Sequence, residues 1–149
     1  ALNLDRLHLF GVPEAVSATG YADASAGIDA IDATLYYSGG LTAVVTGGWF
    51  LAGKFPFSME FAVTMDGATV DYSSMGRPLT VYPMKGEADV KQLPQADGYT
   101  GEIEYFASCC RDGLQPELCP PRESAQAVKL MRLMLEARDR KGEKLACRI

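Results

Sequence analysis

The most constraining feature of this sequence is a strict alternation of side-chain character over residues 57–65. Every second residue from Phe57 to Met65 is large and apolar, and the residues between them are small or polar. Because successive side chains of a strand point to opposite faces, this period of two predicts a strand with one core face and one polar face. Asp66-Gly67 follows directly, and this dipeptide is a strong hairpin signal. The chain is therefore expected to build an antiparallel sheet around this segment.

Further strand patterns lie on both sides of this hairpin. They cover residues 14–20, 29–38, 41–50, 68–73 and 79–84. Gly39-Gly40 separates two of them and predicts a second tight turn. The segment 41–50 is apolar at both parities, with Leu41, Ala43 and Val45 on one face and Thr42, Val44 and Phe50 on the other. This pattern is typical of a central strand that is covered on both faces. Residues 85–98 are polar and predict a loop with a short edge strand.

Helical periodicity replaces the alternation near both ends of the chain. A short helix is predicted over residues 2–10, a second over 99–111 and a longer one over 122–138, and residues 143–149 are expected to form a last strand. The predicted core face of the second helix holds Ile103, Phe106, Ala107 and Cys110. That of the third helix holds Val128, Met131 and Leu135, widened by Ala127, Leu130 and Met134. Strands followed by helices predict an α+β fold: a largely antiparallel mixed sheet of about six or more strands, with helices on one face and the other face available for oligomerisation.

Size and composition narrow the functional class. A chain of 149 residues is the length of one domain. It is 48% hydrophobic and 22% charged, without an apolar run near the roughly 20 residues that span a bilayer, so we expect no membrane association. The net charge of -5 gives no basic field to attract phosphate backbones, so we expect no nucleic-acid partner. Residues 1–6 lack the basic and apolar regions of a secretory signal, which indicates that the chain starts within a longer protein.

The sequence shows little chemistry of its own. It has one histidine, His8, for which we expect a structural or solvated role, since no matched nucleophile lies near it in sequence. The four cysteines lack the paired spacing of zinc sites and predict no metal. We interpret them as free thiols in a reducing cytoplasm, and two of them, Cys109 and Cys110, as small buried hydrophobes. No glycine-rich phosphate loop occurs, so this chain is expected to bind no nucleotide cofactor.

Four stretches match, in order and spacing, a known family. They are residues 4–18, residues 29–49 with the Gly turn and the terminal Gly-Gly-Trp, the hairpin at 65–70, and residues 97–143 with Y-x-x-E-I-x-x-F before the last long helix. Together they cover nearly all of the chain. On these residues the sequence resembles the C-terminal domain of the Gfo/Idh/MocA family, which includes glucose-fructose oxidoreductase and inositol dehydrogenase.

The resemblance implies a larger, two-domain protein. Residues 1–149 would be its single C-terminal domain, which binds substrate and mediates oligomerisation. An N-terminal Rossmann domain would carry the glycine fingerprint, a catalytic Glu-Lys-Pro lysine and NAD or NADP, and the substrate would be a sugar, inositol or related polyol. This chain alone would then be inactive. The family also has a D-x-x-x-H pair ahead of this domain, and if Asp5 is the acid three residues after that His, Leu2 stands at the His position.

Five residues are candidate substrate contacts. Tyr99 and Glu102 match the family's Y-x-x-E, which lies near the active-site cleft, and Asp5 belongs to the segment after the catalytic pair. Trp49 ends a predicted strand and Lys54 follows in the next loop, so an aromatic face and a cation meet at the end of the sheet. The same residues also suit purely structural roles, Tyr99 and Glu102 in capping and packing a helix start and Trp49 in the core. Both interpretations remain open at this stage.

Three functions compete on these observations. The first is the oxidoreductase domain implied by the resemblance, and the second is a non-catalytic binding or assembly module of the same fold. A small independent enzyme built on Asp5, His8 and Tyr99 ranks last, because nothing in the sequence brings these residues together. In the first two cases we expect self-association through the open sheet face, since strand 41–50 is apolar on both sides and two helices cover only one.

Overall fold

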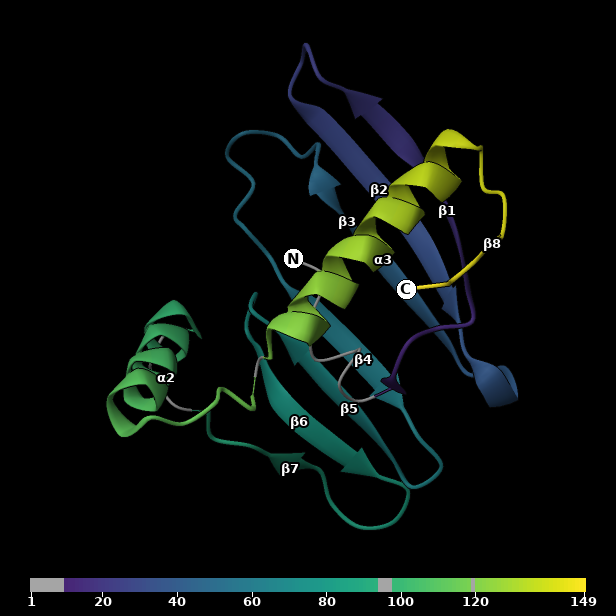
Figure 1. Cartoon of the computed structure of the whole chain (residues 1–149). Helices are drawn as coiled ribbons and strands as arrows, with labels where there is room; N and C mark the ends of the chain where they lie inside the picture. The colour runs from purple at the N-terminus through teal and green to yellow at the C-terminus, as the bar shows by residue number, and fades with distance from the viewer. Residues whose placement is uncertain (1–9, 94–97, 119) are drawn as a thin grey trace. The chain divides into compact units, whose positions relative to one another are not determined.

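The computed structural model describes residues 10–93, 98–118 and 120–149, and confirms the α+β class (Figure 1). The elements are β1 (Ala15–Asp23), β2 (Ile28–Tyr36), the 3-10 turn η1 (Ser38–Gly40), β3 (Thr42–Trp49), β4 (Glu60–Thr64), β5 (Ala68–Ser73), β6 (Arg77–Pro83), β7 (Asp89–Val90), α2 (Gly98–Asp112), α3 (Pro121–Asp139) and β8 (Leu145–Ala146). The helix predicted over residues 2–10 lies outside the described residues except for Phe10.

The strands form two antiparallel sheets of four strands each. Their orders are β3-β2-β1-β8 and β4-β5-β6-β7, where a single sheet of six or more strands was expected. The division falls at residues 50–59, which join β3 to β4 and contain Gly53 and Pro56, residues that disfavour a continuous ladder. Each sheet belongs to its own compact unit, one made of the chain up to Leu51 with Phe106–Ile149 and the other of Ala52–Tyr105.

The core of the first unit lies between its sheet and α3. From β1 and β2 come Val16, Ala18, Ala33 and Leu35, and from α3 come Leu130, Met134 and Ala137, all at most 2% exposed. Figure 1 shows α3 crossing one face of this sheet. The register pairs Leu35 with Ala43 and Ala33 with Val45, so these β3 residues share the covered face. β3 is an edge strand of this sheet and Val44 on its other face is 66% exposed, so the interpretation of this segment as a central strand covered on both faces is wrong.

The buried face of α3 is narrower than its periodicity predicts. Leu130 and Met134 are buried as expected, but Val128 is 50% and Met131 is 41% exposed. Ala137, which the prediction omitted, is fully buried. Spacing of three and four residues assigns side chains to a broad apolar stripe, and only the line that faces the sheet is enclosed. The assignment of Val128 and Met131 to the core is therefore wrong.

The opposite face of the first sheet carries mostly hydroxyl groups. The Ser17 hydroxyl lies 3.0 Å from the Tyr36 hydroxyl, and the Lys144 ammonium lies 3.8 Å from the centre of the Tyr36 ring, a cation–π distance. Val44, paired with Thr34, is aliphatic and 66% exposed. This face is thus open but less apolar than predicted.

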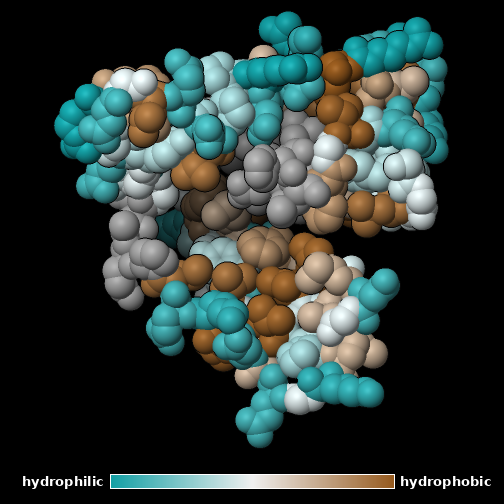
Figure 2. Space-filling view, turned by 60° about the horizontal axis from the view of Figure 1, so that its bottom comes forward, coloured by the Kyte–Doolittle hydropathy of each residue, from teal (hydrophilic) through white to brown (hydrophobic). Residues whose placement is uncertain are grey.

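The second sheet confirms the alternation found in the sequence. Its hairpin closes at Asp66-Gly67, where the Met65 amide donates to the Ala68 carbonyl at 2.8 Å. One face collects half-buried apolar side chains: Phe61, Val63, Val70, Tyr72, Leu79 and Val81. On the other face Arg77 donates to Asp71 at 2.9 Å and to Glu60 at 3.1 Å. Because the apolar side chains of the first face are only half-buried, part of their area lies at the surface. Figure 2 shows apolar surface in brown for the view drawn there.

Helix α2 has the predicted extent but not the predicted core face. Ile103 and Phe106 are 69% and 59% exposed, and Cys110 is exposed as well, whereas its neighbour Cys109 is 6% exposed. Periodicity identifies residues that share a helix face, but it does not determine whether another element covers that face. The expectation that Ile103, Phe106, Ala107 and Cys110 are core residues is therefore wrong.

Candidate functional site

Trp49 stands at the end of β3, beside the end of β2. It is 77% exposed, so the core interpretation of this residue is wrong. The register places it directly opposite Asp29 of β2. Directly paired residues of an antiparallel ladder have Cβ atoms about 4.5–5.5 Å apart. The side chains of Trp49 and Asp29 therefore leave the backbone side by side on the α3 side of the sheet.

Two glycines, Gly48 of β3 and Gly20 of β1, allow their strands to approach the backbone of β2 closely at this point. A Cβ on Gly48 would lie 2.0 Å from the Asp29 carbonyl oxygen, and one on Gly20 of β1 would lie 2.1 Å from the Ala30 carbonyl oxygen. Both residues have positive φ angles, 155° and 149°, that L side chains rarely adopt. The beginning of β2 is thus held between two close backbone approaches, which position Asp29 and, through Gly48, Trp49.

Arg138 brings the end of α3 to the same place. Its Nη1 donates to the Asp29 carboxylate, and its Nε donates to Asp139 at 3.3 Å. The Arg138 side chain is only 12% exposed, whereas that of Asp29 is 53% exposed. Asp29 is therefore oriented by a largely buried guanidinium and keeps oxygen lone pairs open to solvent.

The three residues form what we call the Trp49 platform: Trp49, Asp29 and Arg138. An exposed indole offers a flat apolar surface, and a fixed carboxylate beside it accepts hydrogen bonds from hydroxyl groups. This combination suits a ring compound with one apolar face and hydroxyls at its edge. The platform contains no nucleophile and no matched acid and base, so it can bind but has no visible chemistry.

Three of the other predicted site residues, Tyr99, Glu102 and Lys54, belong to the second unit. Tyr99 and Glu102 are three residues apart on α2 and share a side of that helix, and both are exposed, Tyr99 at 81%. Lys54 is exposed in the turn after Leu51 and belongs to the second unit, whereas Trp49 belongs to the first. Asp5 lies outside the described residues. Of the four predicted site residues that the structure describes, Tyr99 and Glu102 share one element, α2.

Asp29 and Arg138 were missed by the sequence analysis. They are 109 residues apart and are joined through tertiary structure, which no local pattern reveals. Of the two residues, only Arg138 has a local sequence pattern that could have indicated its role. Arg138 is a basic residue in the last turn of a helix, a place that favours a cation, and it follows an apolar stripe that had to face a sheet.

In the part of the chain that the structure describes, no three His, Cys, Asp or Glu side chains gather in a way that would hold a metal ion. Among the helices that the structure describes, none combines the length and apolar character needed to cross a bilayer.

The structure is that of an α+β domain with a helix-covered antiparallel sheet and an exposed tryptophan at one sheet end. The same fold occurs in the "putative oxidoreductase yvaA from Bacillus subtilis", with a TM-score of 0.69 at 19% identity over 97% of this chain and 48% of that one. A "putative oxidoreductase from Klebsiella pneumoniae" gives 0.69 at 18% identity over 98% of this chain and 46% of that one. The chain thus spans about half the length of these proteins. The sequence matches no protein-family model and no curated protein.

Proposed function

We propose that this chain is the C-terminal, substrate-side domain of a two-domain NAD(P)-dependent oxidoreductase of the Gfo/Idh/MocA type, acting on a sugar, inositol or related polyol. The observation that carries the proposal is the fold likeness, which extends over nearly all of this chain but only about half of two longer proteins whose names say oxidoreductase. The cytoplasm is the proposed location, because Cys109, Cys110 and Cys147 are unpaired thiols.

The Gly-Gly pairs of this chain do not provide a dinucleotide site. A pyrophosphate site needs a glycine-rich turn between a strand and the N-terminus of a helix. Here Gly39 and Gly40 lie in η1, and Gly47 and Gly48 lie within β3. NAD or NADP therefore belongs to the other half of the longer protein, and this domain contributes substrate contacts.

The Trp49 platform is the proposed contact surface for the polyol ring. The apolar face of the ring stacks on the indole, and its hydroxyls donate to the Asp29 carboxylate that Arg138 orients. Four other residues of this chain remain candidates for further substrate contacts: Tyr99, Glu102, Lys54 and Asp5.

The test uses the protein encoded by the complete reading frame. We expect it to reduce NAD or NADP with at least one sugar or cyclic polyol as the substrate. The fluorescence of the reduced nicotinamide measures this reaction. Trp49→Ala should raise KM for that substrate, whereas Val128→Ala, an exposed aliphatic change away from the platform, should leave KM unchanged. Absence of dinucleotide-dependent turnover across a broad sugar and polyol panel would argue for the non-catalytic module.

We also propose that the chain self-associates through the open face of the first sheet. α3 covers the other face, and the open face presents Val44, 66% exposed, beside Thr34 and the half-buried Tyr36. A two-fold partner that presents the same surface buries these side chains on both copies.

Light scattering at micromolar protein concentration tests this assembly. We expect the wild-type chain to form dimers or larger oligomers, and Val44→Glu to shift it to monomers, because each interface would then bury two unpaired carboxylates. The matched control is Val128→Glu, which adds the same charge on α3. A monomeric wild-type chain, or a folded Val44→Glu variant that associates as well as the control, would contradict the proposal.

A further inference from the structure

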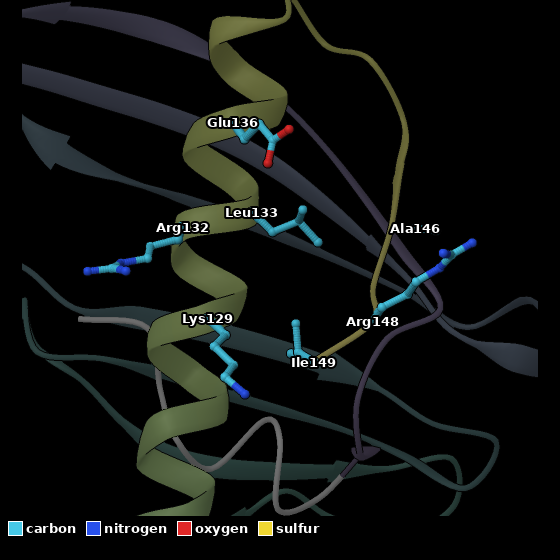
Figure 3. A pocket seen from close by; sticks show the side chains of 7 residues that line it. All are labelled: Lys129, Arg132, Leu133, Glu136, Ala146, Arg148 and Ile149. Carbon is cyan, nitrogen blue, oxygen red and sulfur yellow. The ribbon is translucent and has the colours of Figure 1, made fainter.

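A groove runs between the outer side of α3 and the C-terminal segment of the first unit. The open groove has a volume of about 280 Å³, and its apolar lining comes from Leu133, Ala146 and Ile149. Leu133 and Ile149 also pack against the buried core. The groove is therefore part of the folded unit and not a gap between loose segments (Figure 3).

Both walls of the groove are anchored. β8 pairs with β1 through Val16 and Leu145, and the Cys147 amide donates to the Glu14 carbonyl at 2.8 Å. On the other side α3 is fixed by its buried residues, Leu130 and Met134 among them. A ligand would thus meet a groove whose backbone is already in place.

The charged lining of the groove is basic. Lys129, Arg132 and Arg148 line it and, among the described residues, form no ion pair with an acid. The one acidic side chain in the lining, Glu136, accepts a hydrogen bond from Arg140 at 2.6 Å, so its charge is offset. Residues 122–149 hold eight Lys or Arg and four Asp or Glu, in a chain with 14 and 19 in total. The positive charge is therefore concentrated at this end of the chain.

The directions of the side chains indicate how a ligand would lie. In Figure 3 Lys129 leaves α3 on the side of the C-terminal segment, with its ammonium beyond Ile149, and Leu133 points toward the C-terminal segment. Arg132 and Arg148 extend away from the groove on its two sides, and both are exposed, so their guanidinium groups can turn back over a bound anion. The apolar floor and a single inward ammonium favour a small ligand with an apolar body and one anionic head.

From this arrangement we propose that the α3 groove binds a small organic anion, with its apolar body on Leu133 and Ile149 and its phosphate or carboxylate head on Lys129. Arg132 and Arg148 add electrostatic attraction from either side. This site is distinct from the Trp49 platform and does not depend on the proposed oxidoreductase function. Because the groove is open, we expect binding in the millimolar range.

Titration of the folded 149-residue chain, followed by the chemical shifts of its backbone amides, tests the site. Phenyl phosphate and benzoate are the probes for the two kinds of head, phenol keeps the body without the charge, and inorganic phosphate keeps the charge without the body. We expect phenyl phosphate to shift the amides of residues 129–136 and 145–149, and phenol and inorganic phosphate to bind at least several-fold more weakly. The ratio of phenyl phosphate to benzoate affinity shows which head the groove prefers.

Variants separate a built site from a general charge effect. Lys129→Gln should weaken phenyl phosphate binding about tenfold, as expected for a lost charge-assisted hydrogen bond, and Arg148→Gln should weaken it by a smaller factor. Arg122→Gln removes the same charge from an exposed position of α3 outside the groove and should change binding less than about twofold, since exposed charges are screened. Equal losses in Lys129→Gln and Arg122→Gln, equal binding of phenol, or shifts elsewhere in the chain would each overturn the proposal.

Discussion

Replacing Gly48 by alanine should unfold the first unit at a much lower temperature. The added Cβ would lie 2.0 Å from the Asp29 carbonyl oxygen, a backbone atom that cannot turn away, and Gly48 has a φ of 155°. Strain at such a backbone position and overpacking each cost about 1–3 kcal/mol, so we expect a loss of about 3–5 kcal/mol. For a domain of this size that loss lowers Tm by more than about 10 °C.

The preceding residue provides the control for this prediction. A Cβ on Gly47 meets no atom within 4 Å, and its φ is not in the left-handed region. Gly47→Ala should therefore keep the wild-type Tm or raise it slightly, because alanine restricts the unfolded chain. Thermal unfolding followed by circular dichroism compares the two variants. If Gly48→Ala melts together with Gly47→Ala, the close approach of β3 to β2 that positions Trp49 and Asp29 does not exist in solution.

Truncating Leu130 should have the second large effect. Leu130 is 1% exposed and lies in the cluster between α3 and the first sheet. Removing a buried leucine side chain leaves a cavity and typically costs about 2–5 kcal/mol. Urea unfolding of Leu130→Ala should therefore show a clearly lower midpoint with little change in slope.

Met131, the next residue on the same helix, is the matched comparison. It is 41% exposed, so Met131→Ala should cost less than about 1 kcal/mol. The two variants also test which side of the apolar stripe faces the sheet, because the sequence pattern assigned both Leu130 and Met131 to the core face. Equal losses for the two variants would show that α3 is rotated relative to the structure.

The positions of the strands could be predicted from the sequence, because turn residues and alternating side chains determine strand ends over a few neighbouring residues. β5 covers Ala68–Ser73, as the residues after Asp66-Gly67 predict. β4 begins later than its alternation suggests, at Glu60, because the Met59 amide donates to the Ser74 hydroxyl at 2.9 Å and its carbonyl accepts from the Ser74 amide. These bonds replace the ladder there. A competing partner from a distant turn has no signature in the alternation itself.

Burial and site assembly depended on contacts that the sequence does not encode locally. The periodicity of α2 correctly grouped Ile103 with Phe106 on one face, but their exposure depends on what covers that face. Trp49 was recognised as a candidate from its place at a strand end, whereas its neighbours Asp29 and Arg138 could be identified only once the register of β2 with β3 and the path of α3 were known.

The most direct measurement of the proposed function is a calorimetric titration of the purified 149-residue chain with NADH and NADPH, alongside the protein from the complete reading frame. We predict dinucleotide binding to the longer protein and no detectable heat of binding to the chain alone, since its Gly-Gly pairs lie in η1 and β3 and not in a turn that leads into a helix. Tight, stoichiometric binding of either dinucleotide to the chain alone would contradict its assignment as the substrate-side half of a two-domain oxidoreductase.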